Sequence, residues 1–475
     1  LKIPLALVPL LLLPYSLESQ ALSATTSERI HGTAPYLTFD GGVTKVTKTE
    51  DLLGIKLSDG RTFTSQNNSS SPTAPIKLPN IGDTLADIEM IVPPSSDSIN
   101  INDLVTQGKW GDDDGDGQGV NGVVASGSIS VLFTDKDGSA VSRGDALDIC
   151  KAPYKVTLSS TEGNLATQYG EPRSSTFSGG TAEYYITLPS PPVICAVRPN
   201  LLLGGTTGLG WDDQIYAGPA NIWDPAKGFL VQSTSPSSYD RNFPTTGSDG
   251  LYFDLDIGGL DASLLGWTVT TRGDITATVN WRLPVSDQNN SDIDRWIRDK
   301  SKYVTRVTLH GPKADSAQIS SSLPSSLARP SFPQTFELVG RDRSGNEVKY
   351  GFVLKQWFVN RGAQKTNVSN QTAWCNSLGY RMPRVSDLTN AVRRASLPIS
   401  GAAPSSSGNY YQRHIGAGFF TEWGSMYNYA DAGFVDDLYW TSDAAGSNQF
   451  AITSGDGGVL DGSASYSNYA VCTAL

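Results

Sequence analysis

The chain has 475 residues, of which 17% are charged and 38% hydrophobic, and its formal net charge at pH 7 is −11. This length exceeds that of a single hydrophobic core, so we expect more than one domain. The acidic balance, with no basic stripe along the sequence, excludes a surface that follows nucleic-acid phosphates. Gly (48) and Pro (27) are abundant, as in β-rich extracellular proteins with many short strands and turns.

The N-terminal sequence predicts a signal peptide at 1–24. Lys2 precedes a short apolar run, and Ala21-Leu-Ser-Ala24 is typical of a cleavage region. The run is too short and too rich in Pro to anchor the chain in a bilayer, and the alternative is a buried strand. We therefore expect an exported protein with no transmembrane segment after cleavage.

The next elements, up to residue 205, are expected to be short strands. Residues 25–120 alternate apolar runs with turn clusters and form an N-terminal β-rich region that ends in an Asp-rich loop. Residues 121–205 carry a clearer pattern, with strands expected at 128–134, 154–158 and 182–188. Their regular spacing predicts an Ig-like β-sandwich.

A second β-sandwich-like region is expected over 206–358, before a C-terminal domain over 359–475. Alternating apolar residues predict strands at 250–256, 274–281, 305–310, 335–339 and 350–358. Helices are few, and we expect them at 292–300, 368–378 and 385–394.

The four cysteines predict two disulfides, because the chain is expected to be exported. The pairing of Cys150 with Cys195 and of Cys375 with Cys472 keeps each bridge inside one apparent domain. The second bridge closes a loop of 472 − 375 + 1 = 98 residues, which is worth about 4–5 kcal/mol in the chain-entropy model. A metal site is the alternative, but the three His residues are widely separated.

The Asp-rich loop is a candidate calcium site. Asp112, Asp114 and Asp116, followed by Gly117, match the opening of a calcium loop, in which oxygens at alternate positions converge on one cation. Val123 stands where an EF-hand has its bidentate acid. The hypothesis is a structural Ca²⁺ at a domain junction, with no other cofactor required, and the alternative is a solvated acidic turn.

Two Arg-Gly-Asp tripeptides occur, at 143–145 and 272–274. Integrins recognise an exposed Arg and Asp on either side of a flexible Gly. However, Asp274 is predicted to open a strand and Arg143 lies close to one, so we expect neither tripeptide to be displayed on a loop.

The sequence does not support catalysis, and we do not expect an enzyme. With three His and no Gly-x-Ser-x-Gly motif, a Ser-His-Asp triad is disfavoured. The better signal is the aromatic concentration over 410–440, because aromatic faces stack on sugar rings or anchor protein contacts. The candidate ligand-binding residues are Tyr410, Tyr411, Trp423, Tyr427 and Tyr429. Trp423 is also an expected core residue, whereas the four tyrosines, near turn residues, are the surface candidates.

The stretches 208–219, 238–244, 350–362 and 374–388 resemble the enterobacterial adhesion-domain proteins, a family related to or fused with intimin- and invasin-type surface adhesins. The resemblance covers about 25–475. It implies a mainly β fold, with tandem Ig-like β-sandwich domains followed by an α+β C-type-lectin-like domain.

Within this resemblance, Cys375 and Cys472 match the terminal disulfide of the lectin fold, and 439–442 its core strand. The calcium-and-sugar motif of true lectins is absent, so aromatic loops rather than a metal are expected to supply recognition.

The leading hypothesis, which the resemblance implies, is a non-enzymatic adhesin that is secreted or lies on the bacterial cell surface or outer membrane. Its C-terminal domain is expected to bind a host cell-surface glycoprotein, glycan or receptor. Deletion of 360–475 is then expected to abolish cell binding and leave a folded remainder. One alternative is a secreted enzyme, because lectin-like folds also occur in oxidases that use a reactive thiol pair, here Cys375 and Cys472. The other is a structural subunit of a surface fibre.

Overall fold

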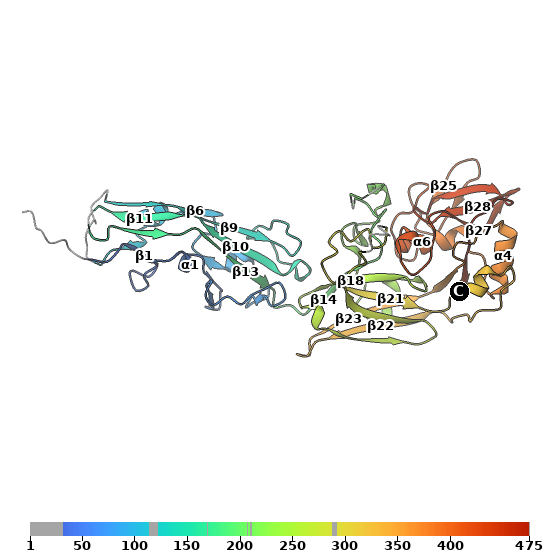
Figure 1. The fold of residues 1–475 in the computed structure, drawn as a ribbon, viewed down its shortest axis with the longest axis horizontal. Coiled ribbons are helices and arrows are strands. Elements are labelled where there is room, and N and C mark those ends of the chain that lie inside the picture. The colour runs from blue at the N-terminus through green and yellow to red at the C-terminus, as the bar shows by residue number, and fades with distance from the viewer. Residues whose placement is uncertain are drawn as a thin grey trace, which may run out of the picture.

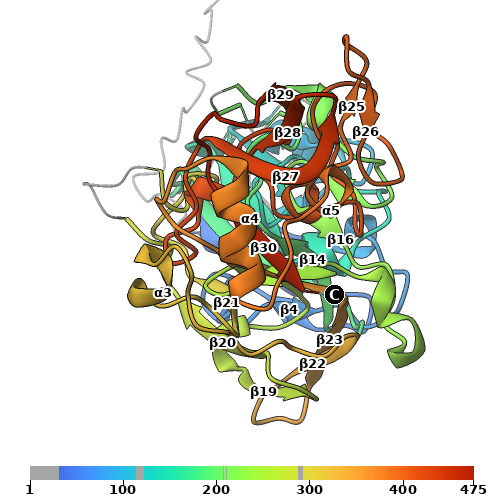
Figure 2. The ribbon, with the colours of Figure 1, turned by 90° about the vertical axis from the view of Figure 1, so that its right-hand side faces the viewer.

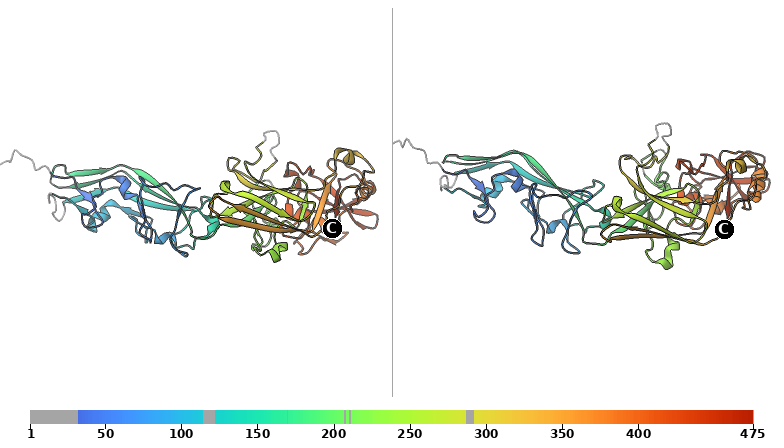
Figure 3. Two further views of the ribbon diagram at one scale, coloured as in Figure 1. Left: turned by 90° about the horizontal axis from the view of Figure 1, so that it is seen from below. Right: turned by 60° about the horizontal axis from the view of Figure 1, so that its bottom comes forward.

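A computed structural model describes residues 32–113, 122–168, 170–206, 208–209, 211–286 and 292–474. The molecule is elongated, with two lobes joined end to end (Figure 1, Figure 3). We call 32–188 the first lobe and 193–474 the second lobe, because each has its own hydrophobic core. The predicted signal peptide at 1–24 lies outside the described residues. Within them, no helix is both long and apolar enough to cross a membrane.

The first lobe is a β-sandwich whose central strands alternate between the core and solvent. In β9 (Ser128–Thr134) the buried residues are Ile129, Val131 and Phe133, each separated by one outward-facing residue. This period of two matches the pleat of a strand that is covered on one face. β9 pairs with β10 (Tyr154–Ser160), and β10 pairs with β13 (Gly180–Thr187), both in antiparallel register.

The five-stranded sheet of this lobe has the order β4-β13-β10-β9-β6, and smaller sheets have the orders β12-β11-β8, β3-β2-β5 and β1-β7. The remaining strands are β1 (Tyr36–Leu37), β2 (Ile55–Lys56), β3 (Thr62–Phe63), β4 (Ile76–Lys77), β5 (Glu89–Met90), β6 (Ser98–Asn100), β7 (Trp110–Gly111), β8 (Val123–Ser126), β11 (Gly163–Thr167) and β12 (Ser174–Phe177). The helices are α1 (Thr49–Leu52), η1 (Leu85–Asp87), α2 (Ile101–Thr106) and η2 (Ile149–Lys151).

The second lobe begins with another β-sandwich. One sheet has the order β15-β16-β14-β18-β21-β20 and the other β19-β22-β23. The strands are β14 (Val193–Arg198), β15 (Trp223–Asp224), β16 (Gly228–Leu230), β18 (Tyr252–Gly258), β19 (Gly266–Thr271), β20 (Thr276–Arg282), β21 (Val304–His310), β22 (Gln334–Arg341) and β23 (Glu347–Leu354). The helical turns are η3 (Gln214–Tyr216), η4 (Pro236–Arg241), η5 (Ala262–Leu264) and α3 (Ser316–Ser320). The predicted mainly β fold with tandem sandwiches is confirmed.

The chain after β23 forms an α+β unit that packs on this sandwich, and the earlier strand β17 joins one of its sheets. Its sheets have the orders β17-β24-β30, β27-β28-β29 and β25-β26. The strands are β17 (Thr246–Ser248), β24 (Gln356–Asn360), β25 (Val392–Arg393), β26 (Ile399–Ser400), β27 (Leu438–Ala445), β28 (Asn448–Thr453), β29 (Val459–Ser463) and β30 (Val471–Ala474). The helices are α4 (Val368–Ser377), α5 (Val385–Leu388), α6 (Phe419–Trp423) and η6 (Met426–Asn428). The likeness of this unit to a C-type lectin stays a prediction.

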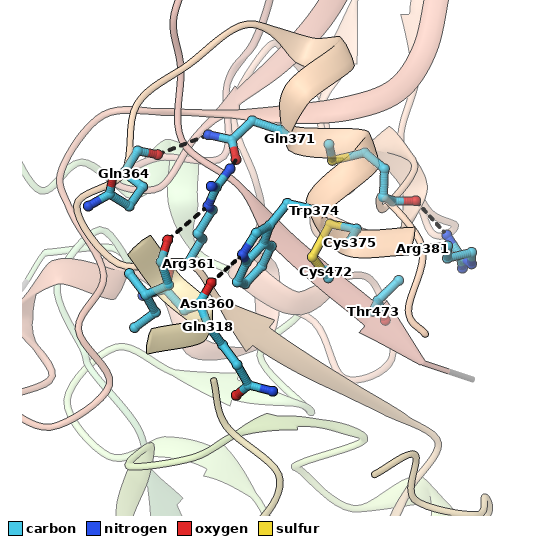
Figure 4. Close-up of a disulfide and its surroundings, with 12 residues drawn as sticks. Gln318, Asn360, Arg361, Gln364, Gln371, Trp374, Cys375, Arg381, Cys472 and Thr473 are labelled. Carbon is cyan, nitrogen blue, oxygen red and sulfur yellow. Dashed lines mark hydrogen bonds between the residues drawn. A yellow bond between two sulfur atoms is a disulfide. The ribbon is translucent and has the colours of Figure 1, made fainter. Parts of the chain in front are cut away.

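A disulfide closes this α+β unit. Cys375 in α4 is bonded to Cys472 in β30, as predicted, and both residues are fully buried. Arg361 donates to the Gln371 side chain over 2.8 Å, and the Trp374 indole donates to the Gln318 carbonyl over 2.8 Å (Figure 4). Figure 2 looks onto this end of the molecule, where α4 lies beside β30.

One helix prediction is wrong, for a reason that the contacts show, and a second predicted helix is shorter than expected. The segment 292–300 forms turns, because the Asp294 carboxylate accepts from the Arg306 guanidinium over 2.8 Å and from the Tyr252 hydroxyl over 2.7 Å. Asp294 also has a positive φ of 52°, which a helix does not contain. The predicted helix at 385–394 ends at Leu388, before β25. The helix predicted at 368–378 is α4, and it begins after the Asn367 cap.

The structure divides the chain differently from the four predicted regions. The regions 25–120 and 121–205 share one core through the pairings of β4 with β13 and of β6 with β9. The boundary between the lobes lies at 188–193, because β14 pairs with β18 of the second lobe. The sandwich of 206–358 and the α+β unit of 359–475 share one continuous cluster of buried residues, from Ile194 to Ala474.

The two lobes are linked covalently at this boundary. Cys150 in η2 of the first lobe is bonded to Cys195 in β14 of the second lobe. The predicted pairing is therefore confirmed, but its placement inside one domain is wrong. Asp256 reinforces the joint, because its carboxylate contacts Lys136 of the first lobe at 2.8 Å and Arg198 of the second lobe at 3.3 Å.

Candidate functional site

A hollow with a largely apolar lining lies in the second lobe, between the loop before β15 and the C-terminal α+β unit. It has a volume of about 540 Å³. Trp211 stands at this hollow and is 92% exposed, the largest exposed fraction of any big hydrophobic side chain among the described residues. We call it the Trp211 hollow. It is lined by Leu202, Leu203, Leu209, Trp211, Asp213, Ile215, Tyr216, Arg295, Ser425, Tyr427, Asp436, Thr453, Gly455 and Asp456.

The loop that carries Trp211 is fixed at its start by Asn200, which is fully buried. The Asn200 amide donates to the Ser425 carbonyl over 2.7 Å and to the Asn428 side chain over 3.1 Å. Its backbone N–H donates to the Tyr429 hydroxyl over 2.8 Å. A buried side chain with several satisfied hydrogen bonds holds one geometry, so the loop leaves the α+β unit in a fixed direction.

Within the loop, Asp212 closes a tight turn. Its carboxylate accepts from the backbone N–H groups of Gly204 at 3.1 Å and Gly205 at 2.8 Å. Gly205 has a φ of +98°, which favours glycine. The buried Trp223 indole donates to the Gly204 carbonyl over 2.6 Å. These contacts anchor Asp212, the residue that follows the exposed Trp211.

Arg413 fixes the other end of the loop. It is fully buried, and its guanidinium donates to the backbone carbonyls of Thr421 at 3.2 Å, Glu422 at 3.1 Å and Asn200. Its backbone N–H donates to the Tyr216 carbonyl over 3.0 Å. Because burial disfavours the charged form, the pKa of Arg413 is lowered from its ordinary value. This buried cation ties both ends of the loop to the α+β unit.

The polar groups at the hollow are mainly acidic. Asp213, Asp436 and Asp456 line it, and Arg295 is the one basic residue of the lining. Burial raises the pKa of Asp436, and the negative charges of Asp437 and Asp456 raise it further. The pKa of the Tyr216 hydroxyl is also raised, by burial first and then by Asp456. The hollow therefore combines exposed aromatic and aliphatic surface with a negative potential.

Two of the five predicted ligand-binding residues lie at or near this hollow. Tyr427 is one of its lining residues and is half-buried. Tyr410 is also half-buried, and it packs edge-on against Tyr216, with ring centroids 5.6 Å apart. The Tyr410 hydroxyl is 3.0 Å from the Ser407 hydroxyl. Tyr410 therefore lies behind the lining and supports it.

The other three predicted residues are corrected, because they are buried. Tyr411 and Trp423 are 0% exposed and Tyr429 is 2% exposed, so none can contact a ligand directly. The Arg413 guanidinium lies over the Tyr411 ring at 5.6 Å. The Tyr429 hydroxyl donates to the Trp423 carbonyl over 2.8 Å. These residues hold the wall of the hollow together, and the core role expected for Trp423 is confirmed.

The predicted calcium site is described only in part. Asp112 is buried, whereas Asp114 and Asp116 lie outside the described residues. In the described ranges, no group of three or more His, Cys, Asp or Glu side chains could hold a metal ion. The calcium hypothesis stays a prediction.

The sequence interpretation missed Trp211, Ile215 and Tyr216, which supply one wall of the hollow. Trp211 lies between turn-forming residues, Gly210 and Asp212, and this pattern signals an exposed aromatic residue. The aromatic residues over 410–440, which the sequence interpretation favoured, mostly fill the core. The approach of the 202–216 loop to the α+β unit has no local sequence signal.

No protein-family model matches the chain. A curated relative, the inverse autotransporter adhesin YeeJ of Escherichia coli (strain K12), is 31% identical over 121 residues. The predicted resemblance to bacterial surface adhesins is confirmed. The matched segment is 25% of this chain and 4% of the relative, so this chain spans a small part of that adhesin.

Solved structures of two other adhesins give weaker likenesses. Invasin, described as a bacterial integrin-binding protein, has a TM-score of 0.34 at 12% identity, over 75% of this chain and 52% of invasin. A C-terminal 282-residue fragment of intimin, in complex with the intimin-binding domain of its receptor Tir, has a TM-score of 0.31 at 12% identity, over 74% of this chain and 93% of the fragment. At these scores we transfer nothing from either structure.

Proposed function

We propose that this chain is a non-enzymatic adhesin, secreted or displayed on the bacterial surface, and that the Trp211 hollow binds a glycan or glycoprotein of a host cell. The similarity to a named adhesin supports the general role. The observation that carries the site is Trp211, a large aromatic side chain that is 92% exposed on an anchored turn beside an apolar hollow. Exposed aromatic residues of this kind mark binding surfaces.

The chemistry of the hollow favours a sugar. An indole face stacks on the apolar face of a sugar ring, and carboxylates accept hydrogen bonds from its hydroxyls. Trp211 supplies the face, and Asp213 and Asp456 supply the acceptors. Because the local charge is negative, we expect neutral or amino sugars to bind better than sialylated ones.

The oxidase alternative needs Cys375 and Cys472 as free thiols. The two residues form a disulfide, and both are fully buried. The described residues contain no free cysteine. This arrangement gives the oxidase alternative no support and agrees with a structural role for the pair.

The test is an array of immobilised neutral, amino and sialylated glycans and host glycoproteins, probed with the full chain. The key variant is Trp211→Ala, and the matched control is Trp281→Ala, which removes an exposed indole that is not part of the hollow lining. We expect Trp211→Ala to weaken binding by about tenfold or more, as for an interface hot spot. The control should bind like the wild type. Equal binding by wild type and Trp211→Ala would refute the site.

A further inference from the structure

The two Arg-Gly-Asp tripeptides have opposite environments. Arg143 is 7% exposed, and its guanidinium donates twice to the Val92 carbonyl, over 3.3 Å in each case. It also lies over the Phe133 ring at 5.3 Å. An Arg held in this way cannot reach a partner, so the tripeptide at 143–145 is structural.

The tripeptide at 272–274 is displayed instead. It forms the turn between β19 and β20, and Arg272, Gly273 and Asp274 are all exposed. Among the described residues, neither the Arg272 nor the Asp274 side chain has a hydrogen-bond or ion-pair partner. The expectation that a strand would hide Asp274 is wrong, because β20 begins at Thr276.

The turn connects two strands that belong to different sheets. β19 pairs with β22, where Thr271 faces Phe336, and β20 pairs with β21, where Thr276 faces His310. The tripeptide therefore crosses from one sheet to the other. Neighbouring strands do not cover its side chains.

Both ends of the turn are fixed by one buried side chain. Gln334 is 1% exposed, and its amide donates to the Thr271 hydroxyl over 2.6 Å and to the Ile275 carbonyl over 2.6 Å. Ile275 is itself fully buried in the core. The residues on either side of Arg-Gly-Asp are thus anchored. Gln334 bridges Thr271 and Ile275, so the two ends of the tripeptide are held close together.

The middle residue must be glycine. Gly273 has a φ of +141°, and a Cβ atom there would lie 2.5 Å from Gln334 Oε1 and 2.7 Å from Gln334 Cδ. Gln334 cannot move aside without losing its two hydrogen bonds, so any side chain at 273 would distort the turn. Glycine therefore lets the chain lie against Gln334 while the Arg272 and Asp274 side chains remain exposed.

We propose that this turn is a second binding site, for a receptor of the integrin type that presents a divalent cation next to an acidic group. The Asp274 carboxylate is a hard oxygen ligand able to complete the coordination of such a cation. The Arg272 guanidinium matches a carboxylate in a fork geometry. A closed turn also loses less conformational entropy on binding than a free peptide. The turn shares no residue with the lining of the Trp211 hollow, so the two sites can be tested separately.

The test is biolayer interferometry with the full chain and purified ectodomains of the fibronectin-receptor and vitronectin-receptor integrins, in Mn²⁺ and again in EDTA. The variants are Asp274→Asn and its matched control Asp145→Asn, which changes the same residue type in the structural tripeptide. Circular dichroism and thermal melting establish that both variants are folded. Asp274→Glu keeps the charge but displaces the carboxylate, and Trp211→Ala tests independence from the hollow.

We expect cation-dependent binding that a cyclic Arg-Gly-Asp peptide inhibits. Asp274→Asn and Asp274→Glu should weaken binding by about tenfold or more, as expected when a central charged contact is lost, whereas Asp145→Asn and Trp211→Ala should bind like the wild type. The proposal is overturned if neither ectodomain binds, if binding persists in EDTA, or if Asp274→Asn binds as tightly as Asp145→Asn. Loss of binding in Trp211→Ala alone would assign the receptor to the hollow and would also overturn it.

Discussion

The two lobes are both β-sandwiches, but their cores are built differently. The core of the first lobe is mainly aliphatic, with few rings, such as Phe133, Tyr154 and Tyr184. The core of the second lobe contains many aromatic rings, and among the described residues this lobe buries more charged side chains than the first, including Arg306, Arg413 and Glu422. An aliphatic sandwich needs only the alternating pattern to fold, whereas buried charges need specific partners.

Under the proposed function, this difference would separate a spacer from a recognition unit. Both candidate binding sites, the Trp211 hollow and the turn at 272–274, lie in the second lobe. Its buried polar contacts fix the loops that carry these sites, as Asn200 does for Trp211 and Gln334 does for Asp274. The first lobe is joined to the second lobe by the Cys150–Cys195 disulfide. It separates the second lobe from the N-terminal end of the molecule (Figure 1).

The largest expected effect comes from deleting 360–475. The structure revises the expectation that this truncation leaves a folded remainder, because the core of the second lobe runs through the deletion point. The Phe243 ring, for example, packs on Trp423 at 4.9 Å. We expect 193–359 to lose its fold while the first lobe keeps its own unfolding transition. Calorimetry of the truncated chain checks this, and a folded second sandwich would show that the lobe divides as the sequence suggested.

Removing the Cys375–Cys472 disulfide, which closes the α+β unit, should have the next largest effect. The double variant Cys375→Ser, Cys472→Ser is expected to lower the free energy of unfolding by about 4–5 kcal/mol, because the unfolded chain gains the freedom of a long loop. Guanidinium titration should show this loss in the transition of the second lobe. An equal shift in the transition of the first lobe would contradict the independence of the two cores.

The joint can be tested in the same way with Cys150→Ser, Cys195→Ser. The loop closed by Cys150–Cys195 is shorter, and the chain-entropy model predicts that removing this disulfide lowers the free energy of unfolding by about 4 kcal/mol. The Asp256 contacts to Lys136 and Arg198 remain, so the lobes should stay in contact but sample a wider range of orientations. Small-angle scattering measures that range. An unchanged profile would mean that the ionic contacts alone fix the joint.

A smaller decrease in the free energy of unfolding is expected for Glu422→Gln. The buried carboxylate accepts from the backbone N–H and hydroxyl of Thr245 and of Thr246 and from the Gly416 N–H. A glutamine amide places donors against some of these donors, at a cost of about 3 kcal/mol. Urea titration measures the loss. The matched control is Glu347→Gln on an exposed hairpin, where we expect about 0.5 kcal/mol or less.

The sequence predicted the parts of the fold that depend on local pattern. Strands such as β18, β20 and β21 and helix α4 follow from alternation and capping, and the cysteine count predicts two disulfides. The division into domains could not be predicted in this way. Phe243, Thr245 and Thr246 contact Trp423 and Glu422 across about 180 residues of sequence, and no local signal reports such contacts.

The candidate site was predictable only in part for a related reason. Aromatic residues fill a core as readily as they form a binding surface, so their number over 410–440 did not distinguish Tyr427 from the buried Tyr411 and Trp423. An exposed aromatic residue is better indicated by its neighbours. Trp211 lies among Gly and Asp residues that form turns rather than strands.

The central claim is that the Trp211 hollow recognises the host surface, and quantitative binding of the labelled full chain to intact mammalian cells tests it most directly. Trp211→Ala should raise the apparent Kd by about tenfold or more, while Trp281→Ala, which removes an exposed indole outside the hollow lining, should leave it unchanged. Combining each variant with Asp274→Asn removes any binding through the turn. If Trp211→Ala binds those cells as tightly as Trp281→Ala, the hollow is not the recognition site.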